Sequence, residues 1–162
     1  FVHEFGHHFA ALADEYYTSD VAYETGAAEI PEPWEPNVTA LKDPANPKWK
    51  ELVEKGTPLP TPWSKEPFEK TSREFQARRK ALLAAGAPPA AVDDLFREQR
   101  KVEAAFFAKE KHAGTVGAFE GAAYEAKGLY RSSADCIMFT RTEGGFCPVC
   151  RKAIEKVIDS YR

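Results

Sequence analysis

The chain opens with hydrophobic residues at helical spacing. Four apolar side chains recur at intervals of three, four and three positions: Val2, Phe5, Phe9 and Leu12. These intervals place side chains on one face of a helix, so the pattern predicts a helix over residues 1–13. Residues 14–30 are polar and aromatic without a clear period, and no regular element is predicted there.

Residues 31–67 contain nine of the twelve prolines. Proline lacks a backbone donor and fixes φ, so this stretch is predicted to be extended and irregular. It also contains Trp34, Trp49 and Trp63, which are rare in disordered linkers. We therefore expect the segment to wrap over the body with its indoles buried. The sequon at Asn37 matches a glycosylation triplet that arises often by chance.

Two helical segments follow. Residues 67–85 are charged and end before Gly86 and two prolines, and residues 90–112 carry a single apolar stripe. The stripe consists of Val92, Leu95, Phe96, Val102, Ala105 and Phe106. We expect a helical-hairpin insertion over residues 67–113 that packs this stripe on the core.

The last third of the chain changes character. Residues 114–145 are rich in glycine and aromatic residues and predict loops with short strands. Residues 148–161 predict a final helix, with Pro148 at its first position. Its expected buried face consists of Val149, Ala153, Ile154, Val157 and Ile158. The pattern as a whole predicts one α+β domain, mostly helical, over residues 1–162.

Composition excludes some functions. The chain is 43% hydrophobic and 29% charged, and its net charge is −3. There is no broad basic field, so nucleic acid is not an expected partner. No apolar run approaches the roughly 20 residues of a membrane span. Because the chain begins at Phe1, almost on its best motif, we expect a piece of a longer or processed protein with any targeting segment upstream.

The opening helix carries a possible metal motif. Residues four apart lie on one helical face, so His3 and His7 can aim imidazole nitrogens at one zinc ion. Glu4 lies roughly 100° around the helix from His3 and flanks that ion. Zinc acidifies bound water, and Glu4 is placed to accept the proton as a general base.

The third ligand is less certain from spacing. On a continuous helix, Asp14 would lie about 10 Å along the axis from His7, too far for the same ion. The chain must therefore turn back between Ala10 and Asp14, although the alanines there favour helix. Asp14 is the first choice and Glu15 the second. Glu24 or Glu29, on a following helix, would give a different arrangement of the same metal.

Three stretches together resemble a known family. The strings "HEFGHHFAALADEYY", "GAFEGAAYEAKGLYRSSADCIMFTR" and "FCPVCRKAI" resemble the IgA-peptidase family of bacterial zinc metallopeptidases, which are metzincin-like. The resemblance implies zinc ligands at His3 and His7, a catalytic base at Glu4 and an acidic ligand at Asp14. It also implies that Met138 forms the methionine turn beneath the metal.

The sequence departs from the metzincin string at several points. The usual string has a glycine and a third ligand three and six residues after the second histidine, where this chain has Ala10 and Ala13. Thr140 stands where some relatives carry a tyrosine that stabilises the transition state. Tyr124, Tyr130 or Arg141 are the remaining candidates for that role. The sheet that binds substrate lies upstream in such enzymes, so the chain is expected to be the C-terminal part of the catalytic domain.

Three cysteines lie close together in the sequence: Cys136, Cys147 and Cys150. In the context of the family, a disulfide from Cys136 to Cys147 or Cys150 would pin the methionine turn to the last helix. Free buried thiols, redox chemistry at the Cys-Pro-Val-Cys turn and a second metal are the alternatives. A cysteine-rich zinc site needs a fourth ligand, for which only His112 offers itself.

These observations predict a zinc-dependent metalloendopeptidase that hydrolyses protein or peptide substrates, secreted or located in the periplasm or cell envelope. One catalytic Zn²⁺ is the expected cofactor. A non-catalytic, zinc-stabilised binding or envelope module of the same fold is the alternative, and a thiol-redox module is a third hypothesis.

Overall fold

The computed structural model describes residues 1–18 and 30–162. Within these residues the chain is α+β, with four α-helices and one three-stranded antiparallel sheet. The helices are α1 (Val2–Ala10), α2 (Lys65–Ala84), α3 (Pro89–Phe107) and α4 (Pro148–Asp159). The expected mostly helical α+β class is therefore compatible with the structure.

The sheet is small and has β3 (Glu125–Arg131) at its centre. One neighbour is β1 (Val38–Thr39), from the proline-rich segment, and the other is β2 (Phe119–Ala122). β2 and β3 form a hairpin whose two connecting residues, Ala123 and Tyr124, both have positive φ. A two-residue turn of this kind usually contains asparagine or glycine, so its occurrence here suggests a specific role for these side chains.

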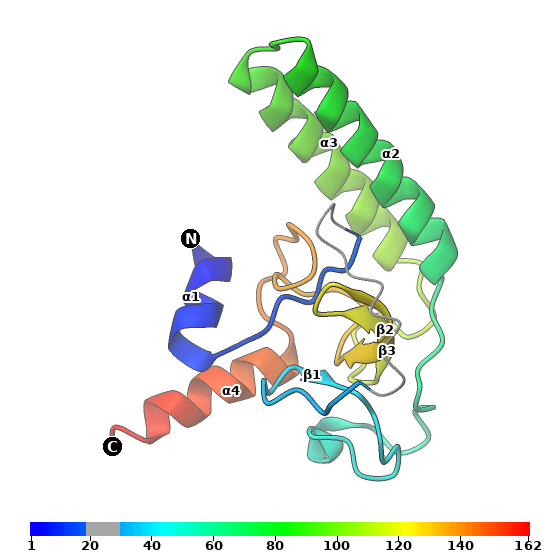
Figure 1. The fold of residues 1–162 in the computed structure, drawn as a ribbon. Helices are drawn as coiled ribbons and strands as arrows, with labels where there is room; N and C mark the ends of the chain where they lie inside the picture. The colour runs from blue at the N-terminus through cyan, green and yellow to red at the C-terminus, as the bar shows by residue number, and fades with distance from the viewer. Residues whose placement is uncertain (19–29) are drawn as a thin grey trace.

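The hydrophobic core lies where the sheet, α1, α4 and the loop before α4 meet. Its largest fully buried side chains include Trp49, Phe119 and Met138. α1 and α4 contact each other directly and lie side by side in Figure 1. One side of α1 therefore packs on the core.

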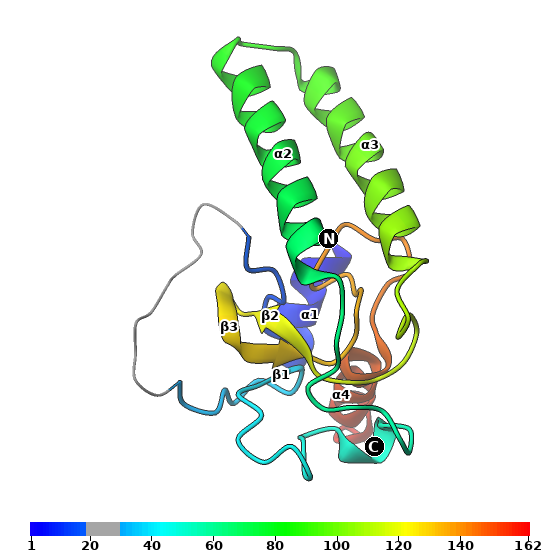
Figure 2. The same cartoon turned by 90° about the vertical axis from the view of Figure 1, so that its right-hand side faces the viewer.

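The predicted helical hairpin is present. α2 and α3 run antiparallel and project away from the sheet (Figures 1 and 2). At the base, Phe68 and Phe107 pack on Phe139, with ring centroids 5.0 and 6.0 Å away. The predicted stripe is wrong at Val102 and Ala105, which are exposed because the projecting hairpin leaves part of α3 uncovered.

The proline-rich segment wraps over the body as expected, with a short 3₁₀ turn at Lys50–Leu52. Trp49 is buried, and its indole N–H donates to the Gly117 carbonyl at 2.8 Å. Trp63 is half-buried. The prediction is wrong for Trp34, which is 77% exposed.

In neither terminal helix do the buried positions follow the apolar spacing throughout. α1 ends at Ala10, and its inward face is formed by His3, Gly6, His7 and Ala10 rather than by the apolar residues. Val2 and Phe5 are 47% and 39% exposed. In α4, Val149, Cys150 and Ala153 are buried but Ile158 is exposed, because the helix extends past the core.

Candidate metal centre

The end of α1 explains how the chain turns back. Ala11 adopts a left-handed conformation, φ 51° and ψ 38°. Its N–H donates to the His7 carbonyl at 3.0 Å, and the Leu12 N–H donates to the Gly6 carbonyl at 3.2 Å. The Ala11 bond is that of a left-handed (αL) helix end, the Leu12 bond reaches back to the preceding turn, and the Leu12 side chain is buried there. The helix-favouring alanines are thus overridden by tertiary packing, and the turn predicted between Ala10 and Asp14 is present.

Asn37 holds the returning chain in place, and sequence reasoning missed it. The Ala13 N–H donates to Asn37 Oδ1 at 2.8 Å, and Asn37 Nδ2 donates to the Ala13 carbonyl at 3.0 Å. The same Nδ2 donates to Glu15 Oε1 at 2.9 Å. Asn37 is fully buried, so its glycosylation triplet is a coincidence of sequence. Asn37 thus fixes the backbone of Ala13 before Asp14 and the carboxylate of Glu15 after it.

The structure brings His3, His7 and Asp14 together. His3 Nε2 and His7 Nε2 are 3.0 Å apart, and they lie 2.9 and 3.1 Å from Asp14 Oδ1. All three side chains are half-buried. Of the alternatives for the third position, Glu15 belongs to a different cluster, and Glu24 and Glu29 lie outside the described residues.

Hydrogen bonds fix the orientation of both imidazoles. His3 Nδ1 lies 2.8 Å from the Ile137 carbonyl and His7 Nδ1 lies 2.6 Å from the Leu12 carbonyl. A carbonyl only accepts, so each Nδ1 carries a proton and each ring directs its Nε2 to the centre. This is how metal-binding histidines are usually oriented.

The donor set fits zinc. Two nitrogen lone pairs and a carboxylate converge, and such a group of acceptors is stable only around a shared proton or a cation. A tetrahedral zinc site separates such ligand atoms by about 3.3 Å. The observed 2.9 to 3.1 Å therefore needs adjustments of only a few tenths of an ångström.

Two tyrosines complete the surroundings of Asp14. The Tyr124 hydroxyl donates to Asp14 Oδ2 and lies 3.0 Å from the Tyr16 hydroxyl. Burial alone would raise the pKa of Asp14, but hydrogen bonds from His3, Tyr124 and Tyr16 outweigh it and lower this pKa to about 2. The Asp14 bond in turn is the main cause that raises the pKa of His3. Asp14 is thus held as a carboxylate.

Of the other predicted site residues, Met138 packs on α1, whereas Tyr130 and Arg141 contact other parts of the molecule. Met138 is fully buried against α1: a Cβ added at Gly6 would lie 2.9 Å from its Sδ. Tyr130 lies on β3 opposite Thr39 and Glu120, away from the histidine cluster. Arg141 stacks on Phe96 of α3, with its guanidinium carbon 3.9 Å from the ring centroid.

A cavity of about 850 Å³ opens beside His3. His3, Glu4 and Tyr16 line it from one side, and residues of α2 and α3 line it from the other. Glu4 is exposed, so its carboxylate is accessible to solvent in this cavity. The hairpin, expected to be a structural insertion, therefore also forms a wall next to the candidate metal centre.

The expected Cys136–Cys147 disulfide is absent. Cys136, Cys147 and Cys150 are free thiols, all buried, and they surround Glu15. His112 is not part of this group, so the expectation of His112 as a fourth ligand is wrong as well. Burial of the thiols also leaves the redox hypothesis without an accessible sulfur.

The sequence matches a known protein family over nearly its whole length. The family model described as IgA Peptidase M64 matches residues 1–158. The chain belongs to the IgA peptidase M64 family. It matches none of the curated proteins with which it was compared. The family resemblance seen in the sequence is thus confirmed, and the chain comes from a peptidase.

In the parts of the chain that the structure describes, none of the helices combines the length and the apolar character that crossing a membrane requires.

Proposed function

We propose that this M64 peptidase is a zinc-dependent metalloendopeptidase whose metal is held by His3, His7 and Asp14. The observation that carries the proposal is the convergence of three oriented acceptor atoms within 2.9 to 3.1 Å at the edge of an open cavity. A structural zinc site is closed by four protein ligands, whereas a catalytic one keeps an open position. Three protein ligands beside a cavity correspond to the catalytic kind.

The bound zinc ion would supply Lewis acidity, polarising a peptide carbonyl and acidifying water. Glu4 is exposed in the cavity next to His3. Its carboxylate accepts a proton from the attacking water and returns it to the leaving amine. The Ile137 and Leu12 carbonyls accept from Nδ1 of the two histidines and so leave Nε2 for the metal, and the tyrosines keep Asp14 ionised.

The turn after α1 supports a metzincin-like arrangement. Asp14 follows the left-handed Ala11 by three residues, which is the interval from glycine to third ligand in the metzincin string. The extra residue in this chain therefore lies before the turn, within the last part of α1. This accounts for the departure at Ala10 and Ala13 without moving the ligand.

Tyr124 is better placed than Tyr130 to stabilise a transition state. The turn between β2 and β3 directs Tyr124 to the centre, where its hydroxyl contacts Asp14. Burial, reinforced by Asp14 and Tyr16, raises the pKa of Tyr124, so the hydroxyl keeps its proton. The single phenol proton is donated to Asp14 here, so Tyr124 would turn from Asp14 to donate to the oxygen on which charge develops.

The cavity between α1 and the hairpin suits a peptide segment of a protein substrate. Its size lies in the range of ligand-binding clefts, about 300 to 1,000 Å³. We place the enzyme outside the cytoplasm, either secreted or in the cell envelope, as the family resemblance suggested.

The test is a Glu4→Gln variant of the full-length zinc-loaded protein, assayed on a mixed-protein substrate by mass spectrometry of new termini. We expect cleavage to fall about 10²- to 10⁴-fold while bound zinc is unchanged, because only the proton acceptor is lost. Glu74→Gln, on the outer surface of α2, is the matched control. A zinc-loaded wild type that cuts no protein would contradict the proposal and favour the binding module.

A further inference from the structure

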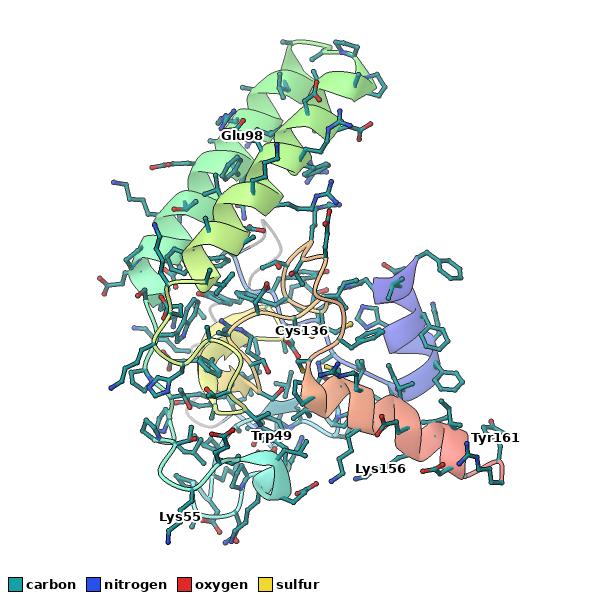
Figure 3. All side chains as sticks on the ribbon, turned by 180° about the vertical axis from the view of Figure 1, so that it is seen from behind. Trp49, Lys55, Glu98, Cys136, Lys156 and Tyr161 are labelled. Atoms are coloured by element: carbon teal, nitrogen blue, oxygen red, sulfur yellow. The ribbon has the colours of Figure 1, made fainter. Side chains whose placement is uncertain are left out.

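A second cluster of metal-ligand side chains lies on the other side of Asp14. Glu15 meets Cys136, from the methionine turn, and Cys147 and Cys150, from the start of α4. One ligand atom from each lies within 4.8 Å of the others. All four residues are buried, and Figure 3 shows Cys136 in the centre of the body.

The distances in this cluster fit a tetrahedral zinc ion better than a disulfide. Zinc bonds of about 2.3 Å to sulfur and 2.1 Å to oxygen separate two sulfurs by about 3.8 Å, and a sulfur from an oxygen by about 3.6 Å. Cys136 Sγ and Cys150 Sγ are 3.8 Å apart, and Cys150 Sγ is 3.6 Å from Glu15 Oε1. A disulfide would need about 2.05 Å.

Glu15 adds an independent indication of a ligand. The residue is fully buried, and its Oε2 has no hydrogen-bond partner within the described residues. Buried polar atoms are nearly always satisfied, and an exception calls for an ion or a water. A disulfide between any two cysteines would leave this carboxylate buried beside one thiol, with Oε2 still without a hydrogen-bond partner.

Hydrogen-bond donors, a helix start and a guanidinium surround the sulfurs. Cys147 is the N-cap of α4 and Cys150 lies in its first turn, where the helix dipole stabilises negative charge. The Cys147 N–H donates to Cys136 Sγ at 3.3 Å, and the Ser132 hydroxyl lies 3.3 Å from Cys147 Sγ. The buried Arg131 guanidinium interacts electrostatically with Glu15 and Cys136.

We propose that Glu15, Cys136, Cys147 and Cys150 bind a second zinc ion, which is structural. Four protein ligands and complete burial leave no open position for a substrate. The Glu15 N–H donates to the Met138 carbonyl at 2.8 Å, so this ion would tie the returning chain to the methionine turn and to α4. It would thereby position Asp14 without touching the reaction.

Adjacent residues offer a matched pair of variants. Asp14→Asn and Glu15→Gln each remove one carboxylate, and each changes only one of the two clusters. The full-length protein, purified with zinc and reductant, is analysed for metal content by mass spectrometry. The same proteins are reconstituted with Co²⁺, because thiolate-to-cobalt charge transfer reports the cysteine cluster alone.

For the wild type we expect about two zinc ions per chain and a thiolate–cobalt band. Asp14→Asn should lower zinc to about one ion and keep the band. Glu15→Gln should weaken zinc binding at the cysteines by about 10-fold or more and shift the band. If the histidine centre alone failed to bind metal, the wild type would hold one ion and still show the band, which separates this proposal from the proposed function.

The proposal is overturned if the wild type shows no thiolate–cobalt band. It is also overturned if intact-mass analysis of the zinc-loaded wild type, after alkylation under denaturing conditions, finds a disulfide among the three cysteines. Both measurements use the wild-type protein, so the test does not depend on whether a cysteine variant folds.

Discussion

Asp14 and Glu15 are consecutive residues that serve clusters of opposite character. The cluster at Asp14 contains two histidines, is half-buried and borders a cavity of about 850 Å³. The cluster at Glu15 contains three cysteines and is fully buried. Because successive side chains of an extended chain point in opposite directions, one short segment supplies a carboxylate to each.

The two clusters also differ in how their backbone is held. Three non-glycine residues with positive φ support the histidine side: Ala11, Ala123 and Tyr124. Each costs about 1 to 2 kcal/mol. The cysteine side is built on the start of an ordinary helix. Local strain is thus concentrated at the centre that borders the cavity, where side chains must be aimed.

Among the variants that test the difference between the two clusters, Tyr124→Phe is expected to have the largest effect. The ring and its turn remain, but the hydroxyl that contacts Asp14 is lost. We expect kcat to fall about 10- to 100-fold, with stability changed by only about 1 kcal/mol. Steady-state kinetics and urea unfolding measure the two. Tyr130→Phe is the matched control, and an equal loss of kcat there would refute the role assigned to Tyr124.

Gly6→Ala tests the packing between α1 and the methionine turn. A Cβ at this position would lie 2.9 Å from both Met138 Sδ and Phe146 Cε1. Overpacking should outweigh the gain in helix propensity and lower the free energy of unfolding by about 1 to 2 kcal/mol. Gly144→Ala meets only Thr142 Oγ1, at 3.4 Å, and should change it by less than about 0.5 kcal/mol. Equal effects in chemical denaturation would show that α1 does not rest on Met138.

The smallest expected effect is a gain in stability from Ala11→Gly. Glycine adopts the left-handed conformation of this helix end without strain, so the free energy of unfolding should rise by about 0.5 to 1 kcal/mol. Ala104→Gly, at an exposed position inside α3, should lower it by about 1 kcal/mol. If both variants lost stability in thermal unfolding, the turn would not have the conformation described.

Periodicity and motif spacing were sufficient for the local elements. The helical hairpin, the last helix and the opening helix follow from apolar spacing, and His3 and His7 follow from residues four apart. Spacing also required a turn before Asp14, and the turn is present at Ala11. These features depend on interactions within a few residues, which a sequence displays directly.

Contacts between residues far apart in the sequence could not be predicted. Asn37 holds Ala13 from 24 positions away, and Glu15 meets cysteines more than 120 positions later. Val2 and Phe5 contribute to the apolar spacing that predicts α1, but both are exposed, and the inward face of α1 is occupied by the histidines and Gly6. Polar residues that face inward for chemistry reverse the pattern on which hydrophobic spacing relies.

Zinc-edge anomalous diffraction from crystals of the zinc-loaded protein tests the central claim most directly. The account predicts one anomalous peak about 2.0 to 2.2 Å from His3 Nε2, His7 Nε2 and an Asp14 carboxylate oxygen, and a second peak among the three cysteine sulfurs and Glu15. The absence of a peak between the two histidines, or a peak there with Asp14 beyond bonding distance, would contradict it.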